Sequence, residues 1–152
     1  MAQTYSDVFN LNVTAIRPFT VYGPFGRPDM AIYKFANAIQ NDIPITLYNN
    51  VNNYRDFTYI SDFVESLSLI IKNPPKSTFK IYDIGNSWPV RIADIIPILE
   101  SFTHKKAKII LDPNPQQEAK FTKADIANFY HDYKYKRWHS FFIEWYLRSN
   151  DC

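Results

Sequence analysis

The residues of this sequence best suited to chemistry are one threonine and two arginines in two short polar segments. Thr20 and Arg27 lie in residues 18–29, a stretch with three prolines and two glycines that predicts a constrained, ordered loop. Arg55 opens a second run at residues 55–60. A guanidinium group pairs with carboxylate or phosphate oxygens through two parallel hydrogen bonds and stays charged at working pH, and a hydroxyl both donates and accepts. These residue types suit the binding of an anionic molecule.

Each of these residues also has an interpretation that involves no ligand. An arginine in a polar loop is most often a solvated side chain, and Arg55 with Asp56 could form a surface ion pair worth less than about 1 kcal/mol. The hydroxyl of Thr20 could bond its own backbone at the end of a strand. Tyr22 and Phe25 are predicted to pack the loop rather than to stack on a base. Spacing alone leaves these alternatives open.

Glycine is scarce, and its placement excludes one familiar kind of site. The chain has three glycines, Gly23, Gly26 and Gly85. A dinucleotide-binding fold needs glycine at a tight turn from a strand into a helix, where backbone N–H groups approach a pyrophosphate. Gly23 and Gly26 share a loop that is too rich in proline to begin a helix in this way. We therefore expect that this chain alone binds no dinucleotide cofactor.

Composition excludes several further classes of protein. A net charge of +2 with dispersed Lys and Arg argues against nucleic acid as a partner. The single cysteine, Cys152, excludes an internal disulfide and a cysteine-based zinc site, and His104, His131 and His139 are not at metal-ligand spacing. No apolar stretch approaches the ~20 residues of a membrane span, and no signal peptide is visible. We expect a cytoplasmic protein without a metal and without a membrane partner.

An α/β domain is expected to position these segments, because strand-like and helix-like stretches alternate along a chain of 152 residues. Residues 2–9 have the pattern of the end of a helix. Strands are predicted from β-rich or alternating composition at 11–17, 45–48, 55–60, 79–84 and 107–111. Helices are predicted from apolar spacing at 28–39, 61–71, 91–103, 123–130 and 140–148.

Two of the predicted helices carry further detail. Ser61 and Asp62 can cap and charge the start of the second one. Its apolar positions are Phe63, Val64, Leu67, Ile70 and Ile71. Pro97 falls inside the helix predicted at 91–103, so that helix either kinks or starts late.

Three segments together resemble a known family. Residues 17–30, RPFTVYGPFGRPDM, are similar to the RxFTVYGPxGRPDMA segment of UDP-glucuronate 4-epimerases, which are extended short-chain dehydrogenase/reductases. Residues 55–62, RDFTYISD, are similar to that family's RDFTYIDD, and residues 81–87, IYDIGNS, to its YNIGNSSP. The resemblance covers nearly the whole chain and fades beyond about residue 112.

The resemblance implies a place within a larger fold. Residues 1–152 correspond to a single partial domain, the substrate-binding half of an NAD-dependent epimerase/dehydratase, with the N-terminal NAD-binding half absent. It comprises the remaining Rossmann-type strands and the small substrate-binding α/β subdomain. Residues 1–10 resemble the second half of the helix that carries the family's Tyr-x-x-x-Lys pair, so this sequence has no counterpart of that pair. The strands at 11–17 and 79–84 would then expose sheet edges.

The resemblance also implies a ligand and roles for four residues. In the intact family, 4-epimerisation proceeds by transient NAD-dependent oxidation at C4 of the sugar. The resemblance places Arg27 towards the sugar, Arg55 towards the diphosphate and Thr20 against the substrate, while Asn86 adds an amide contact. It implies a UDP-sugar as ligand, NAD only in the intact family, no catalytic residue in this chain and no activity of the chain alone. A separate N-terminal half or a second copy of the chain are the expected protein partners.

This sequence departs from the family pattern at several positions. Asp83 stands where Asn is usual, Val51 where Gly is usual, and Asp132 where a turn glycine is expected. Residues 115–118 lack the glycine of a PGDV-like segment that helps to close over the nucleotide. Two alternatives therefore stay open: a non-catalytic remnant that binds a sugar nucleotide or a protein, and a piece of a related nucleotide-sugar dehydratase or decarboxylase.

Overall fold

The computed structural model of the chain is an α/β fold. It describes residues 1–48, 52–113 and 119–133. The helices are α1 (Ala2–Phe9), α2 (Ala31–Gln40), α3 (Ile60–Lys72), α4 (Ile95–Thr103) and α5 (Ala127–Tyr133), with a 3₁₀ turn, η2, at Ile92–Asp94. The strands are β1 (Val13–Pro18), β2 (Val21–Tyr22), β3 (Ile45–Tyr48), β4 (Tyr54–Arg55), β5 (Thr58–Tyr59), β6 (Phe79–Ile84), β7 (Val90–Arg91) and β8 (Ile109–Asp112). Among the described residues the pairs β1–β6, β2–β5 and β3–β8 are parallel, and β4–β7 is antiparallel.

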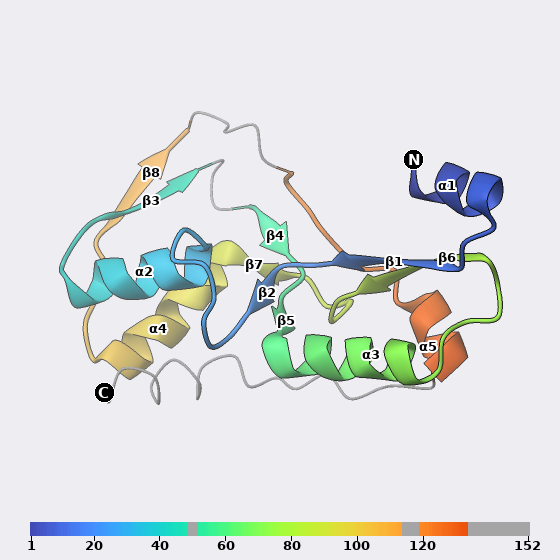
Figure 1. Ribbon diagram of the computed structural model, residues 1–152. Helices are drawn as coiled ribbons and strands as arrows, with labels where there is room; N and C mark the ends of the chain where they lie inside the picture. The colour runs from blue at the N-terminus through green and yellow to red at the C-terminus, as the bar shows by residue number, and fades with distance from the viewer. Residues whose placement is uncertain (49–51, 114–118, 134–152) are drawn as a thin grey trace.

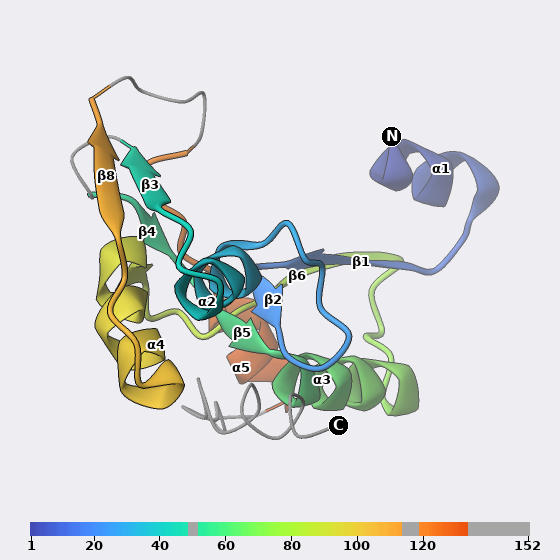
Figure 2. The same ribbon diagram turned by 90° about the vertical axis from the view of Figure 1, so that its left-hand side faces the viewer.

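The parallel pair β1–β6 forms the centre of one half of the molecule (Figure 1). Helices α3 and α5 lie on one side of it, and Figure 2 shows α1 on the other side. The side towards α3 and α5 buries Ile70, Tyr82, Ile84 and Phe129. Within the described part of the chain β1 pairs only with β6. One edge of β1 therefore has no strand partner among these residues, which is the open edge expected for residues 11–17.

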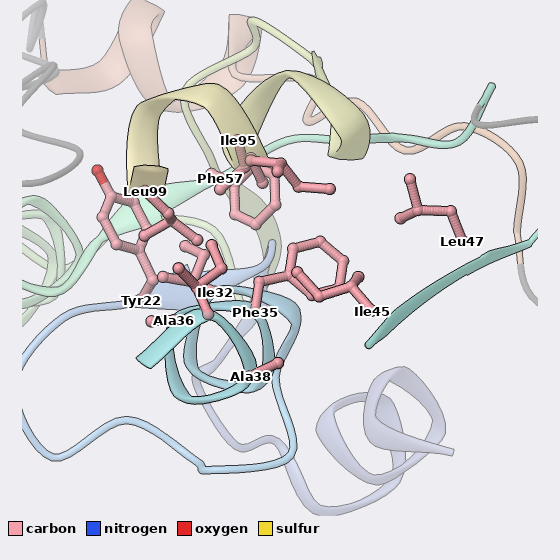
Figure 3. Close-up of a cluster of buried hydrophobic side chains, with 12 residues drawn as sticks. Tyr22, Ile32, Phe35, Ala36, Ala38, Ile45, Leu47, Phe57, Ile95 and Leu99 are labelled. Atoms are coloured by element: carbon pink, nitrogen blue, oxygen red, sulfur yellow. The ribbon is translucent and has the colours of Figure 1, made fainter. Parts of the chain in front are cut away.

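The larger core lies between α2 and α4 in the other half of the molecule. Ile32, Phe35, Ala36 and Ile39 are buried on one face of α2, as their helical spacing predicts. Figure 3 shows Ile32, Phe35 and Ala36 facing Ile95 and Leu99 of α4, with Ile45 of β3 next to Phe35. Leu47 of β3 belongs to the same cluster. Tyr22 and Phe57 join the same cluster, with their rings in an edge-to-face arrangement and the ring centroids 6.2 Å apart. This contact fixes the 18–29 loop and the 55–60 run to one core.

The largest correction to the predicted elements concerns residues 55–60. They do not form one strand: β4 ends at Arg55, β5 spans Thr58–Tyr59, and α3 begins at Ile60. Asp56 and Phe57, which lie between the two strands, are both buried. The predicted cap is also wrong, since α3 begins after Tyr59 without a side-chain cap, and Asp62 is buried in its first turn.

Other boundaries shift for recognisable reasons. The helix that contains Pro97 starts late, at Ile95, which places the proline in the first turn, where no intrahelical N–H bond is lost. The loop at 18–29 contains the short strand β2, and α2 begins at Ala31 rather than at 28–29. The remaining predicted elements appear as α1, β1, β3, β6, β8 and α5, with ends displaced by up to four residues.

Three predictions about single residues are wrong. Val64 and Ile71 are 51% and 70% exposed and do not belong to the core face of α3. Asp132 lies inside α5 rather than in a turn. Predictions for Val51, for residues 115–118, and for the terminal helix with His139 and Cys152 fall outside the described residues.

Candidate functional site

The carboxyl ends of β1 and β6 open into a hollow of about 390 Å³. The residues that line it are Arg17, Pro18, Phe19, Thr20, Asp83 and Thr122. Figure 1 shows the short strands β2, β4, β5 and β7 gathered at this end of the pair. Open parallel sheets bind their ligands outside the carboxyl ends of the strands. We therefore take this hollow and the segments around it as the candidate site.

A buried carboxylate ties three segments together beside the hollow. Asp56 is 0% exposed. Its Oδ1 accepts a hydrogen bond from the backbone N–H of Asn86 at 2.9 Å, and its Oδ2 accepts from the N–H groups of Ser87 at 2.9 Å and Ala124 at 2.8 Å. Burial raises the pKa of Asp56, and these backbone donors oppose that shift. The alternative of a surface ion pair between Arg55 and Asp56 is thereby wrong.

The turn after β6 fits closely against this carboxylate. A Cβ atom on Gly85 would lie 2.4 Å from the Cβ of Ala124, 3.0 Å from Oδ2 of Asp56 and 3.2 Å from the Cβ of Phe19. Only glycine leaves room for this approach without a shift of the neighbouring backbone. The end of β6, the end of β1 and the 122–126 segment are thus packed into one unit.

Arg55 is anchored next to Asp56. Its Nη1 donates hydrogen bonds to the backbone carbonyls of Ala119 at 2.5 Å and Tyr54 at 3.0 Å. The backbone of Tyr54 also pairs with the following segment, since its N–H donates to the carbonyl of Lys120 at 2.9 Å. The guanidinium is half-buried and oriented by the main chain, rather than free on the surface.

Thr20 lies at the junction of the hollow and the strand pair β2–β5. Its carbonyl accepts the N–H of Thr58 at 3.0 Å. Its hydroxyl makes no hydrogen bond with the described residues, its own backbone included, so the alternative of a backbone-bonded hydroxyl is not seen there. Because Thr20 lines the hollow, the hydroxyl keeps both its donor and its acceptor capacity for another molecule.

Arg27 has a different setting from the other three candidates. Its side chain is 76% exposed and pairs with Asp29, with Nε of Arg27 2.9 Å from Oδ1 of the carboxylate. This pairing raises the pKa of Arg27 and lowers the pKa of Asp29. Of the four candidates only Thr20 is among the described residues that line the hollow; Arg27, Arg55 and Asn86 are not. Backbone hydrogen bonds join the segments that carry Thr20, Arg55 and Asn86, through Thr58 N–H to the Thr20 carbonyl and Asn86 N–H to Asp56. Arg27 is instead paired with Asp29.

The two aromatic residues of the loop differ. Tyr22 is buried against Phe57 and Tyr59, as predicted, and this burial raises its pKa. Phe25 is fully exposed with a positive φ of 60°. The prediction that Phe25 packs the loop is wrong.

Sequence reasoning missed four residues of this site: Arg17, Asp56, Asp83 and Thr122. Asp83 carried one signal, because it differs from the family's usual Asn. Asp56 stood within a recognised motif, but only the fold reveals that it is buried. Thr122, whose Oγ1 accepts the N–H of Asp56 at 3.2 Å, lies where the resemblance has faded.

Two kinds of site find no support in the described part of the chain. No group of three or more His, Cys, Asp or Glu residues there could hold a metal ion. No helix there is both long enough and apolar enough to cross a membrane.

Comparison with known proteins places the chain in a family. The family model for NAD-dependent epimerases and dehydratases matches residues 1–85. Protein CapI of Staphylococcus aureus is 39% identical over 97% of this chain and 51% of the relative. UDP-glucuronate 4-epimerase 1 of Arabidopsis thaliana is 34% identical over 97% of this chain and 39% of the relative. The chain thus spans about half the length, or less, of the curated relatives it matches.

A solved structure supports the same placement. UDP-glucuronic acid 4-epimerase from Bacillus cereus, in complex with UDP-glucuronic acid and NAD, superposes with a TM-score of 0.81 at 30% identity, over 91% of this chain and 44% of that chain. The α/β fold predicted from the resemblance is confirmed by this superposition and by the parallel strand pairs. The chain therefore belongs to the NAD-dependent epimerase/dehydratase family of extended short-chain dehydrogenase/reductases and is similar to its UDP-glucuronate 4-epimerases.

Proposed function

We propose that this chain supplies the sugar-nucleotide-binding part of a UDP-glucuronate 4-epimerase. The observation that carries the proposal is the hollow at the carboxyl ends of β1 and β6, where Thr20 presents a hydroxyl that the described residues do not use. Thr20 lies in a segment similar to the epimerase motif. The Bacillus cereus relative was solved with UDP-glucuronic acid and NAD, which supports the same class of ligand here.

The proposed roles follow from the chemistry of each group. Thr20 contacts the sugar, because a hydroxyl suits either a carboxylate or another hydroxyl. Arg55 contacts the diphosphate, and its orientation by backbone carbonyls reduces the entropy lost on binding. Asn86 adds an amide contact from the turn held by Asp56. Arg27 reaches the sugar only after it leaves Asp29, because the two are paired in this structure.

The glycines of this chain do not form a cradle for the pyrophosphate of NAD. A Cβ on Gly23 would lie 2.4 Å from the side chain of Ile60, and one on Gly26 would lie 2.6 Å from the ring of Tyr33. The space at Gly85 is filled by Ala124 in the same way. Each glycine thus makes room for a side chain of this chain rather than for a pyrophosphate. We assign the oxidation at C4 to an NAD-binding half.

The free edge of β1 suits an NAD-binding half. In the described residues β1 has a strand partner on one edge only. Unpaired N–H and C=O groups along such an edge accept a further strand. We propose that an NAD-binding half, whether in the same protein or in a separate one, supplies this strand. A second copy of the chain is the competing occupant. Sedimentation of the chain with and without a co-expressed NAD-binding half distinguishes the two.

Calorimetric titration tests the proposed ligand. The folded chain is titrated with UDP-glucuronate and with UDP, and Arg55→Ala is compared with wild type. We expect UDP-glucuronate to bind more tightly than UDP, and Arg55→Ala to weaken both about tenfold or more, because both ligands carry the diphosphate. Lys106→Ala, which removes an exposed cation that pairs with Glu100, is the control. A folded wild-type chain that binds neither compound would overturn the proposal.

A further inference from the structure

Arg17 and Asp83 form an ion pair at the mouth of the hollow. They are register partners at the carboxyl ends of β1 and β6. Nε of Arg17 donates to Oδ1 of Asp83 at 2.5 Å. Asp83 is only 7% exposed, whereas the side chain of Arg17 is 65% exposed. The carboxylate of Asp83 is therefore enclosed, and the exposed guanidinium of Arg17 lies between it and the open space of the hollow.

Asp83 is itself held in place. Its Oδ2 accepts the backbone N–H of Asp125 at 3.3 Å, so both carboxylate oxygens have a donor. A buried carboxylate that is paired and hydrogen-bonded is stable in one orientation. It thereby fixes the direction in which Arg17 presents its fork.

The terminal groups of Arg17 remain available. Among the described residues the guanidinium bonds only through Nε, so Nη1 and Nη2 are not engaged there. Arg17 and Thr20 line the same hollow, and Arg17 is the only cationic residue among the described residues that line it. A planar fork beside a free hydroxyl matches a carboxylate, which accepts two parallel N–H bonds and a further O–H bond.

We propose that Arg17, oriented by Asp83, receives the carboxylate of the hexuronate sugar and so selects a nucleotide uronate over a neutral nucleotide sugar. This inference rests on the proposed function and adds a residue that determines specificity within the same site. Arg55 is bonded to the backbone at Ala119 and is left to serve the diphosphate. Asp83, which replaces the Asn usual in the family, is the positioning residue.

The test is a comparison of three ligands. Wild type and Arg17→Gln are titrated with UDP-glucuronate, UDP-glucose and UDP. We expect Arg17→Gln to weaken UDP-glucuronate about tenfold to a hundredfold and to leave UDP-glucose and UDP nearly unchanged. Lys106→Gln removes the same charge at an exposed pair with Glu100 and is expected to change none of the three.

The alternatives give different results. Equal weakening of all three ligands would reassign Arg17 to the diphosphate, and no change would make it a surface residue; both overturn the inference while the proposed function stands. A folded wild-type chain that binds none of the three overturns both. Far-UV circular dichroism and thermal unfolding establish that each variant is folded, and Arg17→Lys, which keeps the charge but loses the fork, is the second variant, with an intermediate loss expected.

Asp83 variants separate positioning from a merely structural role. Asp83→Asn keeps a carbonyl oxygen for Nε of Arg17 and is expected to retain most of the preference for UDP-glucuronate over UDP-glucose. Asp83→Ala removes that oxygen and is expected to abolish most of the preference. If Asp83→Ala lowers only the unfolding temperature and leaves the ratio of the two affinities unchanged, Asp83 does not position Arg17.

Discussion

The carboxylate of Asp56 accepts a hydrogen bond at 2.8 Å from the backbone N–H of Ala124, which lies 68 positions later in the chain. The same carboxylate accepts from Asn86 and Ser87 in the turn after β6. One side chain thus joins the segment that carries Arg55, the turn that carries Asn86, and the 122–126 segment. The geometry of the candidate site depends on it.

Replacement of Asp56 by Asn tests this dependence. Both carboxylate oxygens accept N–H groups, so an Asn side chain would turn its own NH₂ towards at least one donor. We expect Asp56→Asn to lower the free energy of unfolding by about 1–3 kcal/mol, the usual effect of an unsatisfied buried polar group. Urea denaturation measures it. Asp29→Asn, which alters an exposed pair with Arg27, is the control and is expected to change stability little. Equal effects of the two changes would show that the buried Asp56 carboxylate does not hold the three segments together.

Gly85→Ala tests the close packing at the same place. The new Cβ would lie 2.4 Å from the Cβ of Ala124. We expect a loss of stability of about 1–3 kcal/mol from overpacking. Ala124→Gly removes the obstructing atom, so the double variant Gly85→Ala with Ala124→Gly is expected to be more stable than the sum of the two single changes allows. Additive free energies of unfolding would show that the two positions do not meet.

Tyr82 and Asp132 predict a dependence of stability on pH. The hydroxyl of Tyr82 donates to Oδ2 of Asp132 at 2.5 Å, and this bond, with His131 and Lys80, lowers the pKa of Asp132 to about 2. A carboxyl group whose pKa is lower in the folded than in the unfolded state stabilises the fold at pH values above its unfolded-state pKa. That stabilisation is lost as the pH falls through the folded-state pKa of about 2. Acid should therefore weaken the fold progressively below about pH 4.

The variant Tyr82→Phe isolates this contribution while it keeps the buried ring. We expect its free energy of unfolding to be about 1–2 kcal/mol below wild type at pH 7, and the difference to shrink as pH falls towards 2. Denaturant unfolding at several pH values measures it. Tyr5→Phe removes an exposed hydroxyl and serves as the control. A difference between Tyr82→Phe and wild type that stays constant with pH would remove Asp132 as its cause.

Arg27→Ala separates binding from folding. The side chain is 76% exposed and contacts Asp29 in its own loop, so its removal is expected to leave the thermal unfolding temperature nearly unchanged. If Arg27 reaches the sugar, the variant weakens UDP-glucuronate and leaves UDP unaffected, unlike Arg55→Ala. Calorimetry of the two variants makes the comparison. Unchanged affinity for both ligands in Arg27→Ala would restrict this arginine to its pair with Asp29.

Much of the fold follows from local patterns. The buried face of α2, with Ile32, Phe35 and Ile39, follows from helical spacing alone. The strand at 45–48 follows from its β-rich composition after Pro44. The family follows from three motifs, at residues 17–30, 55–62 and 81–87, because a motif preserves residue types in order whatever their environment.

Other features depend on contacts between distant segments. Asp56 is adjacent to Arg55 in sequence, which suggests a surface pair, yet it is buried because Asn86, Ser87 and Ala124 supply its donors. Nothing local distinguishes a carboxylate that will meet such donors from a solvated one. For the same reason the run at 55–60 reads as one strand but divides around that side chain.

Residue type and spacing were enough to indicate the family, the main helices and the candidates Thr20, Arg27, Arg55 and Asn86, because they encode local structure and chemistry. The surroundings of these candidates depend on the fold. Asp56 holds the turn of Asn86 beside Arg55, Arg27 is paired with Asp29, and Thr20 lines a hollow with Arg17 and Asp83. Burial and hydrogen-bond partners are set by the packing of segments far apart in the chain, and local composition does not contain that information.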